Sequence, residues 1–82
     1  MLTEYIAAAM KRAKYEIIAE DGTYYGEIPD CPGVWANAET LESCRTELQE
    51  VLEGWLLLKL RDHDNDIPLI DGISLVGESK VA

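Results

Sequence analysis

Residues 14–28 read KYEIIAEDGTYYGEI, and the expected arrangement of the chain follows from them. It contains Asp21-Gly22, a dipeptide that favours a two-residue hairpin turn with positive φ at both turn positions. Such a turn pairs Ile18 with Tyr25, and residues that pair across two antiparallel strands share a face of the sheet. The strands expected on the two sides of the turn are 14–20 and 23–28. The stretch therefore predicts a hairpin whose two faces differ in polarity.

One face of this hairpin is apolar throughout, and the other is mostly polar. The apolar face carries Tyr15, Ile17, Ala19, Tyr24, Gly26 and Ile28. The polar face carries Glu16, Ile18, Glu20, Thr23, Tyr25 and Glu27. Gly26 leaves a gap in the apolar face, where another backbone can approach closely. We expect a helix to cover the apolar face.

A rigid connector and a third strand follow the hairpin. The segment Pro29-Asp30-Cys31-Pro32-Gly33 combines two prolines with a glycine, a composition typical of a tight connection between elements. Val34–Ala38 is predicted to be a short strand with Trp35 on its outer side. Ile18, Tyr25 and Trp35 then share the outer face of the sheet. Three explanations stay open for this patch: cover by the N-terminal helix, a subunit interface, or a binding surface for another protein.

The longest predicted element is a helix from Leu41 to Arg61, with Thr40 as its N-cap. An apolar stripe at helical spacing runs along it: Leu41, Cys44, Leu48, Val51, Leu52, Trp55 and Leu58. A helix of this length spans about 32 Å, whereas a strand of about six residues spans only about 20 Å. We therefore expect the helix to extend beyond the sheet that it covers.

The outer side of the long helix changes character along its length. Its first part is acidic and is expected to be either solvated or a partner-binding face, with Glu42, Glu47, Glu50 and Glu53. Its last part is apolar and points outward, with Leu56, Leu57 and Leu60. The segment Ile67–Ile70 or a second subunit must cover this end. We expect the three leucines to form the interface of a homodimer or tetramer, because a chain this short gains core by assembling.

The ends of the chain complete an α+β fold in a single domain, residues 1–82. An amphipathic helix is expected over 3–13, with Thr3 as a candidate N-cap. The core is expected to span 14–76, and 77–82 carries no structural signal. A last strand, Ile73–Val76, can return parallel to the first strand through a right-handed connection, which predicts the sheet order 3-2-1-4.

Charge and composition narrow the classes of function. Seven basic residues stand against sixteen acidic ones, a formal net charge of −9. A surface this acidic repels the phosphate backbone, so direct DNA or RNA binding is not expected, whereas a basic protein partner would be attracted. The longest apolar run near the N-terminus, Tyr5–Met10, is far shorter than the roughly 20 residues that span a bilayer. We expect a cytoplasmic protein that does not bind membranes.

No group of residues has the spacing of a catalytic, cofactor or metal site, so we do not expect an enzyme. Asp62, Asp64 and Asp66 resemble the start of a calcium loop, but the glycine and glutamate that such a loop needs are replaced by Ile67 and Ile73. The two cysteines, Cys31 and Cys44, form neither a zinc motif nor a disulfide framework and are expected to be free thiols. His63, the single histidine, is expected to be an exposed loop residue.

The motif Tyr24-Tyr25-Gly26-Glu27-Ile28-Pro29-Asp30-Cys31-Pro32-Gly33-Val34, followed by Thr40-Leu41-Glu42-Ser43-Cys44, resembles the HicB-type antitoxin family. The resemblance covers roughly residues 14–76. It implies a partial RNase H-like fold without the catalytic carboxylates of that fold. Full-length members of this family carry a C-terminal DNA-binding segment, and because the sequence ends soon after its last predicted strand, we expect the short form without it.

The resemblance also implies a function. Members of this family bind and neutralise HicA, a small basic toxin that cleaves mRNA. The acidic residues Glu42, Glu47, Glu50 and Glu53 would steer such a partner, and Ile18, Tyr25 and Trp35 would supply contact area. The alternative is a stand-alone oligomerisation or structural module with no toxin partner.

Overall fold

A computed structural model describes residues 2–62 and 67–73 of the chain. The elements follow the order helix, three strands, helix: α1 (Leu2–Lys11), β1 (Lys14–Ile18), β2 (Thr23–Glu27), β3 (Trp35–Ala38) and α2 (Leu41–Arg61). The predicted α+β architecture of an N-terminal helix, an antiparallel meander and a long helix is confirmed. The expected N-terminal helix 3–13 is in fact 2–11, so Thr3 lies inside α1 and is not its N-cap.

The sheet has three strands in the order β1-β2-β3, and both pairings are antiparallel. The described residues contain no fourth strand beside β1, so the order 3-2-1-4 is not observed. Most of the segment predicted for that strand, 74–76, lies outside the described residues, as does the tail 77–82. Its first residue, Ile73, instead forms an isolated antiparallel bridge with Ile70, closing a tight turn over Asp71-Gly72.

The hairpin loop is longer than the predicted two residues. β1 ends at Ile18, which pairs with Thr23, and the N–H of Gly22 donates to the carbonyl of Ile18 at 2.8 Å. Only Gly22 adopts positive φ, at +72°, while the carboxylate of Asp21 accepts hydrogen bonds from the N–H and hydroxyl of Thr23 at 3.0 and 2.7 Å. The predicted register was therefore wrong by two residues. Because side chains alternate with a period of two, each face keeps its predicted residues.

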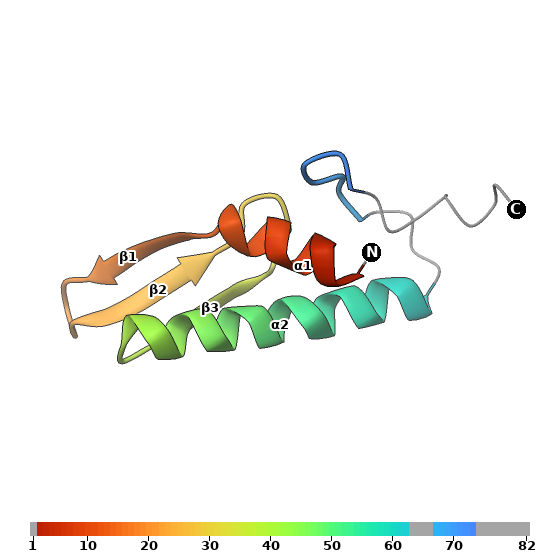
Figure 1. Ribbon diagram of the computed structural model, residues 1–82. Helices are drawn as coiled ribbons and strands as arrows, with labels where there is room; N and C mark the ends of the chain where they lie inside the picture. The colour runs from red at the N-terminus through yellow and green to blue at the C-terminus, as the bar shows by residue number, and fades with distance from the viewer. Residues whose placement is uncertain (1, 63–66, 74–82) are drawn as a thin grey trace, which may run out of the picture.

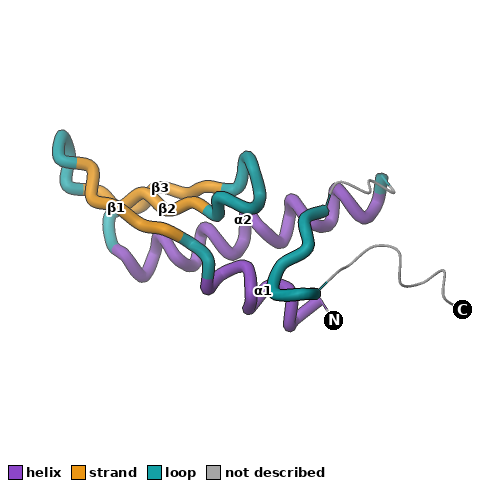
Figure 2. The backbone as a smooth tube through the Cα atoms, turned by 90° about the horizontal axis from the view of Figure 1, so that it is seen from above, coloured by secondary structure: helices purple, strands orange, loops and turns teal. Residues whose placement is uncertain are grey.

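Helix α2 has the predicted bounds and the predicted cap. The hydroxyl of Thr40 accepts a hydrogen bond from the N–H of Ser43 at 3.0 Å, which satisfies one of the free donors of the first turn. The sheet lies over the N-terminal half of α2 and α1 lies over the C-terminal half, so that α1 continues the layer of the sheet (Figure 1). The segment 67–73 lies beside α1, to which it is joined through Tyr5 and Pro68 (Figure 1 and Figure 2).

The buried side chains form one continuous core between α2 and the layer above it. Helix α2 contributes Cys44, Leu48, Leu52 and Leu56, and α1 contributes Tyr5, Ala8 and Ala9. The rest of the core comes from the connector and β3, with Ile28, Cys31, Val34 and Ala36, and from the returning segment, with Ile67 and Ile70. The hydroxyl of Tyr5 donates to the carbonyl of Pro68, which ties the returning segment to α1. The overhang of α2 is therefore covered by α1 and by the segment 67–70 of the same chain.

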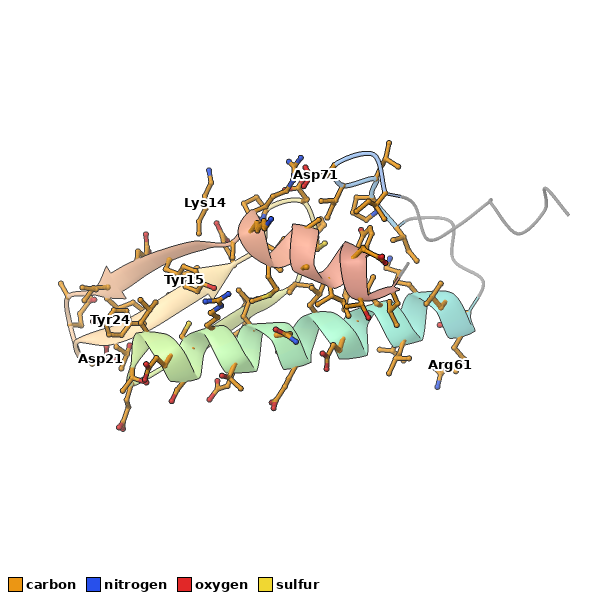
Figure 3. The ribbon with its side chains drawn as sticks, viewed as in Figure 1. Lys14, Tyr15, Asp21, Tyr24, Arg61 and Asp71 are labelled. Carbon is orange, nitrogen blue, oxygen red and sulfur yellow. The ribbon has the colours of Figure 1, made fainter. Side chains whose placement is uncertain are left out.

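Ile17 departs from the predicted core. Its side chain lies on the same face of the sheet as Tyr24, its partner across the strands, yet it is 63% exposed. The reason is its place on β1, an edge strand, because α2 packs beneath β2 and β3. Tyr15 and Tyr24, by contrast, lie between the sheet and α2, while Lys14 points away from α2 (Figure 3).

Candidate protein-binding surfaces

The outer face of the sheet carries an aromatic pair that no described element covers. The rings of Tyr25 and Trp35 stack with centroids 6.1 Å apart and an interplanar angle of 28°, and Trp35 is 55% exposed. Ile18 lies on the same face at the end of β1, where it is partly buried. We call Ile18, Tyr25 and Trp35 the sheet patch. The three side chains share this face as predicted, but they do not form one cluster: Ile18 pairs with Thr23 beside the hairpin loop, whereas Trp35 pairs with Glu27 at the other end of the strands.

Acidic side chains border the sheet patch. Glu16 pairs across the strands with Tyr25, and Glu27 pairs with Trp35 on one side and with Lys14 on the other. The hydroxyl of Tyr25 donates to a carboxylate oxygen of Glu27 at 3.1 Å. Desolvation, followed by this bond to Glu27, raises the pKa of the Tyr25 phenol. At neutral pH the phenol therefore stays protonated and remains a hydrogen-bond donor.

The first of the three explanations left open for this patch is wrong. Helix α1 packs against the C-terminal half of α2 and not on the outer face of the sheet. The reason lies in the overhang of α2, whose apolar end offers α1 a surface that the short strands cannot reach. Within the described residues, the sheet patch is left open to a second molecule.

The acidic residues of α2 lie away from the sheet patch. Glu42, Glu47 and Glu50 line a shallow groove with Ser43 and Thr46. We call these three carboxylates the acidic ridge. Since α2 lies beneath the inner face of the sheet, the acidic ridge and the sheet patch belong to different layers of the molecule (Figure 1). A small partner that lies flat on one surface does not contact the other.

Glu53 stands apart from the acidic ridge. It lines an apolar groove between the two helices, together with Leu2, Ile6, Leu56, Leu57 and Leu60. Of the three leucines predicted at a subunit interface, Leu56 is only 1% exposed and belongs to the core of this chain. Its position is explained by α1, which was not expected to pack there. Leu57 and Leu60 are 64% and 36% exposed.

The cysteines behave as buried apolar residues. Cys31 and Cys44 are both free and fully buried. Burial raises the pKa of the Cys31 thiol to about 11 and also raises the pKa of the Cys44 thiol. Both thiols are therefore protonated at neutral pH, and a protonated buried thiol is a poor nucleophile.

Two further features concern metals and membranes. Within residues 2–62 and 67–73, no three His, Cys, Asp or Glu side chains gather as a metal site would require. No helix in the described part of the chain is long and apolar enough to cross a membrane. His63, Asp64 and Asp66 lie outside the described residues.

Two groups of side-chain contacts were not predicted from the sequence. The guanidinium of Arg12 donates to the carboxylates of Asp30 and Asp71, at 3.3 and 2.8 Å. These ion pairs join the end of α1 to the connector and to the turn at 71–72. Asn37 likewise holds the outer face of the sheet, because its amide donates to the hydroxyl of Thr23 and to the carbonyl of Tyr24. Neither contact has a local sequence signal, since each joins residues far apart in the chain.

Comparison with known proteins shows the family to which this fold belongs. The model of the UPF0150-like family matches residues 4–68, which include most of α1, the meander, all of α2 and the start of the returning segment. The chain belongs to the UPF0150-like family. This family is HicB-like, so the resemblance seen in the connector and in the start of α2 is confirmed at the level of the family.

A solved structure supports the assignment of this UPF0150-like chain. It is similar to the crystal structure of TTHA0281 from Thermus thermophilus, with 52% sequence identity and a TM-score of 0.73. The match covers 77% of this chain and 78% of that one. The search of curated proteins gave no match.

Proposed function

We propose that this UPF0150-like chain is a non-enzymatic, antitoxin-like module that binds and neutralises a small basic mRNA-cleaving toxin of the HicA type. Membership of a HicB-like family supports the proposal. The observation that carries it is the sheet patch, a stacked tyrosine and tryptophan left open on one face of the sheet and bordered by carboxylates. Tyrosine and tryptophan are the side chains that most often dominate binding energy at protein interfaces.

The sheet patch is suited to a basic partner. The face of an aromatic ring attracts a cation, and arginine is the commonest cation in such contacts. The other tryptophan of the chain already has such a partner, because the ammonium of Lys59 lies 5.2 Å from the centre of the Trp55 ring. Trp35 is stacked on Tyr25 and lies beside Glu27 instead. A lysine or arginine of the toxin would therefore meet both a ring and a carboxylate here.

The acidic ridge has a different role in this proposal. Because it lies on another layer, it does not touch a partner that rests on the sheet patch. Its charge acts at long range, and together with the net charge of −9 it raises the rate at which a basic protein arrives. The sheet patch would then set the rate of dissociation, as buried contacts usually do.

The proposal is tested with the full chain as bait in an extract of its native host, at low and at moderate salt. Support requires that the chain retain a small basic protein, that this protein cleave mRNA, and that added chain stop the cleavage. A retained protein without ribonuclease activity, or no retained basic protein, refutes the proposal and favours a stand-alone structural module.

Variants of the two surfaces sharpen this test. We expect Trp35→Ala to speed dissociation of the toxin by at least about tenfold, as removal of an aromatic anchor does. The control is Leu69→Ala, because Leu69 is similarly exposed, at 63%, but lies in the returning segment. Glu47→Lys with Glu50→Lys should slow association and reduce its dependence on salt, with dissociation unchanged. If Trp35→Ala leaves dissociation unchanged, the sheet patch is not the contact surface.

A further inference from the structure

The outward side of α2 around Leu57 is an apolar surface that no described residue covers. Leu57 is 64% exposed and Leu60, one turn later, is 36% exposed. Both line the groove that α2 forms with Leu2 and Ile6 of α1. Contiguous apolar surface of this kind usually marks a contact with another molecule.

A glycine lies in the same surface. Gly54 is in the interior of α2, where glycine is less favourable than almost any other residue because it loses more backbone freedom. A Cβ at residue 54 would meet no atom within 4 Å other than the neighbouring backbone of α2 itself, so packing among the described residues does not require a glycine there. Gly26, in contrast, is required by its own surroundings, since a Cβ would lie 2.8 Å from the ring of Tyr15. The described fold therefore gives no packing reason for a glycine at residue 54.

A two-fold axis through Leu57 would place complementary residues of two α2 helices opposite each other. On a helix surface the nearest neighbours of Leu57 are residues three and four positions away. Toward the N-terminus these are Gly54 and Glu53, and toward the C-terminus they are Leu60 and Arg61. Gly54 and Leu60, one small and one large and apolar, thus lie at equal distances on the two sides of Leu57. Glu53 and Arg61, which have opposite charges, do so as well.

We propose that two copies of this chain associate through α2, antiparallel, with a two-fold axis passing close to Leu57. In such an isologous contact each pairing occurs twice. Leu57 meets Leu57 of the second copy on the axis, Leu60 fills the space above the second copy's Gly54, and Glu53 faces the second copy's Arg61. Gly54 then has a function, because it lets the two helix backbones approach closely.

The charged pair is available for this contact. Within the chain Glu53 accepts a hydrogen bond from Gln49 at 3.2 Å, and Arg61 pairs with its neighbour Asp62 at 3.4 Å. Both interactions are at the surface, where such pairs contribute little and rearrange readily. Arg61 projects outward from the end of α2 (Figure 3). This dimer leaves the sheet patch free, because that patch lies on the other layer of the molecule, whereas Glu50 of the acidic ridge lies two turns from Leu57 on the same side of α2.

The first test measures the mass of the full chain in solution by sedimentation equilibrium over about 1–100 μM. We expect a dimer for the wild type and a monomer for Leu57→Glu, which would bring two carboxylates together on the axis. Leu58→Glu is the matched control, because Leu58 is also exposed, at 52%, but lies about 100° around the helix from Leu57. Circular dichroism shows whether each variant is folded. A wild-type monomer at 100 μM, or a Leu57→Glu dimer, overturns the proposal.

The second test addresses the register. Glu53→Arg and Arg61→Glu should each weaken the dimer, and the double variant should restore it, because only the antiparallel register places these residues opposite each other. Gly54→Gln should weaken dimerisation at least about tenfold, since every lost contact counts twice, while strengthening the helix itself. A double variant that stays as weak as the single ones, or a Gly54→Gln dimer of unchanged affinity, refutes the antiparallel contact.

A cross-link provides a positive readout that does not depend on loss of binding. A cysteine introduced as Leu57→Cys would face its own copy across the axis and form an intermolecular disulfide on mild oxidation. The native thiols Cys31 and Cys44 are fully buried and do not compete. Leu58→Cys should not cross-link at the same rate. Equal cross-linking of the two variants contradicts the proposal.

Discussion

Gly26 lies where the sheet packs closely on α2, and its replacement by alanine measures how tightly the side chains around it pack. A Cβ at residue 26 would lie 2.8 Å from two ring atoms of Tyr15 and 3.1 Å from Sγ of Cys44. Forcing extra atoms into a packed core typically costs about 1–3 kcal/mol. Gly26 does not have positive φ, so alanine also restricts the unfolded chain, which offsets about 0.4–1 kcal/mol of that cost. We expect Gly26→Ala to lower the free energy of unfolding by about 1–2 kcal/mol.

The assay is urea denaturation followed by circular dichroism, at a protein concentration that is the same for all variants. The ring of Tyr15 is only partly buried and can swing aside, whereas Cys44 is held in the middle of the core by α2. The cost of Gly26→Ala should therefore fall by more than half in a Cys44→Ala background, as a double-mutant cycle would show. If Gly26→Ala is as stable as the wild type, or costs the same in both backgrounds, the contact between the layers is not what the distances indicate.

Three further outcomes follow from single contacts. Thr40→Ala should lower the free energy of unfolding by about 1 kcal/mol and Thr40→Ser by much less, because serine can still accept from the N–H of Ser43; equal losses in urea denaturation would contradict the cap. Tyr5→Phe should cost about 1–2 kcal/mol, since it leaves the carbonyl of Pro68 without its donor, and it should speed amide exchange of Ile70 and Ile73, whose two N–H groups close the turn. Burial raises the pKa of the Cys31 thiol to about 11, from an ordinary value of 9.0, so the folded state binds this proton more tightly than the unfolded state. The free energy of unfolding should therefore begin to fall as the pH rises above about 9. This fall should be smaller in Cys31→Ala, which has no thiol to titrate.

Local signals explain why much of the fold was predictable. The bounds of α2 follow from Thr40, whose hydroxyl caps the first turn, and from the apolar stripe that the core absorbs at Cys44 and Leu48. The division of the hairpin into an apolar and a polar face survives even a shift of register, because it depends only on alternation along each strand. For the same reason Ile18, Tyr25 and Trp35 are found on one face, as expected.

Features set by distant contacts were not predictable in this way. The loop that contains Asp21-Gly22 has four residues because the Asp21 carboxylate binds Thr23 and so stabilises a wider turn. The amphipathic pattern of α1 showed that it must pack on something, but not that it would cover Leu52 and Leu56 of α2. The place of Leu56 in the core, and the exposure of Ile17 at the edge of the sheet, follow from where α1 and α2 lie.

Among the described residues, the outer face of the sheet supplies no side chain to the hydrophobic core. Strands β2 and β3 present their small residues, Gly26 and Ala36, to α2, and direct Tyr25, Trp35 and Asn37 the other way. Because Tyr25 and Trp35 lie outside the core, mutation at these two positions is only weakly constrained by folding, whereas Asn37 is constrained by its hydrogen bonds to Thr23 and Tyr24. Related proteins can therefore change the partner that they bind through substitutions on the outer face, while the side chains that face α2 stay the same. We expect divergent relatives to differ most at these outward positions.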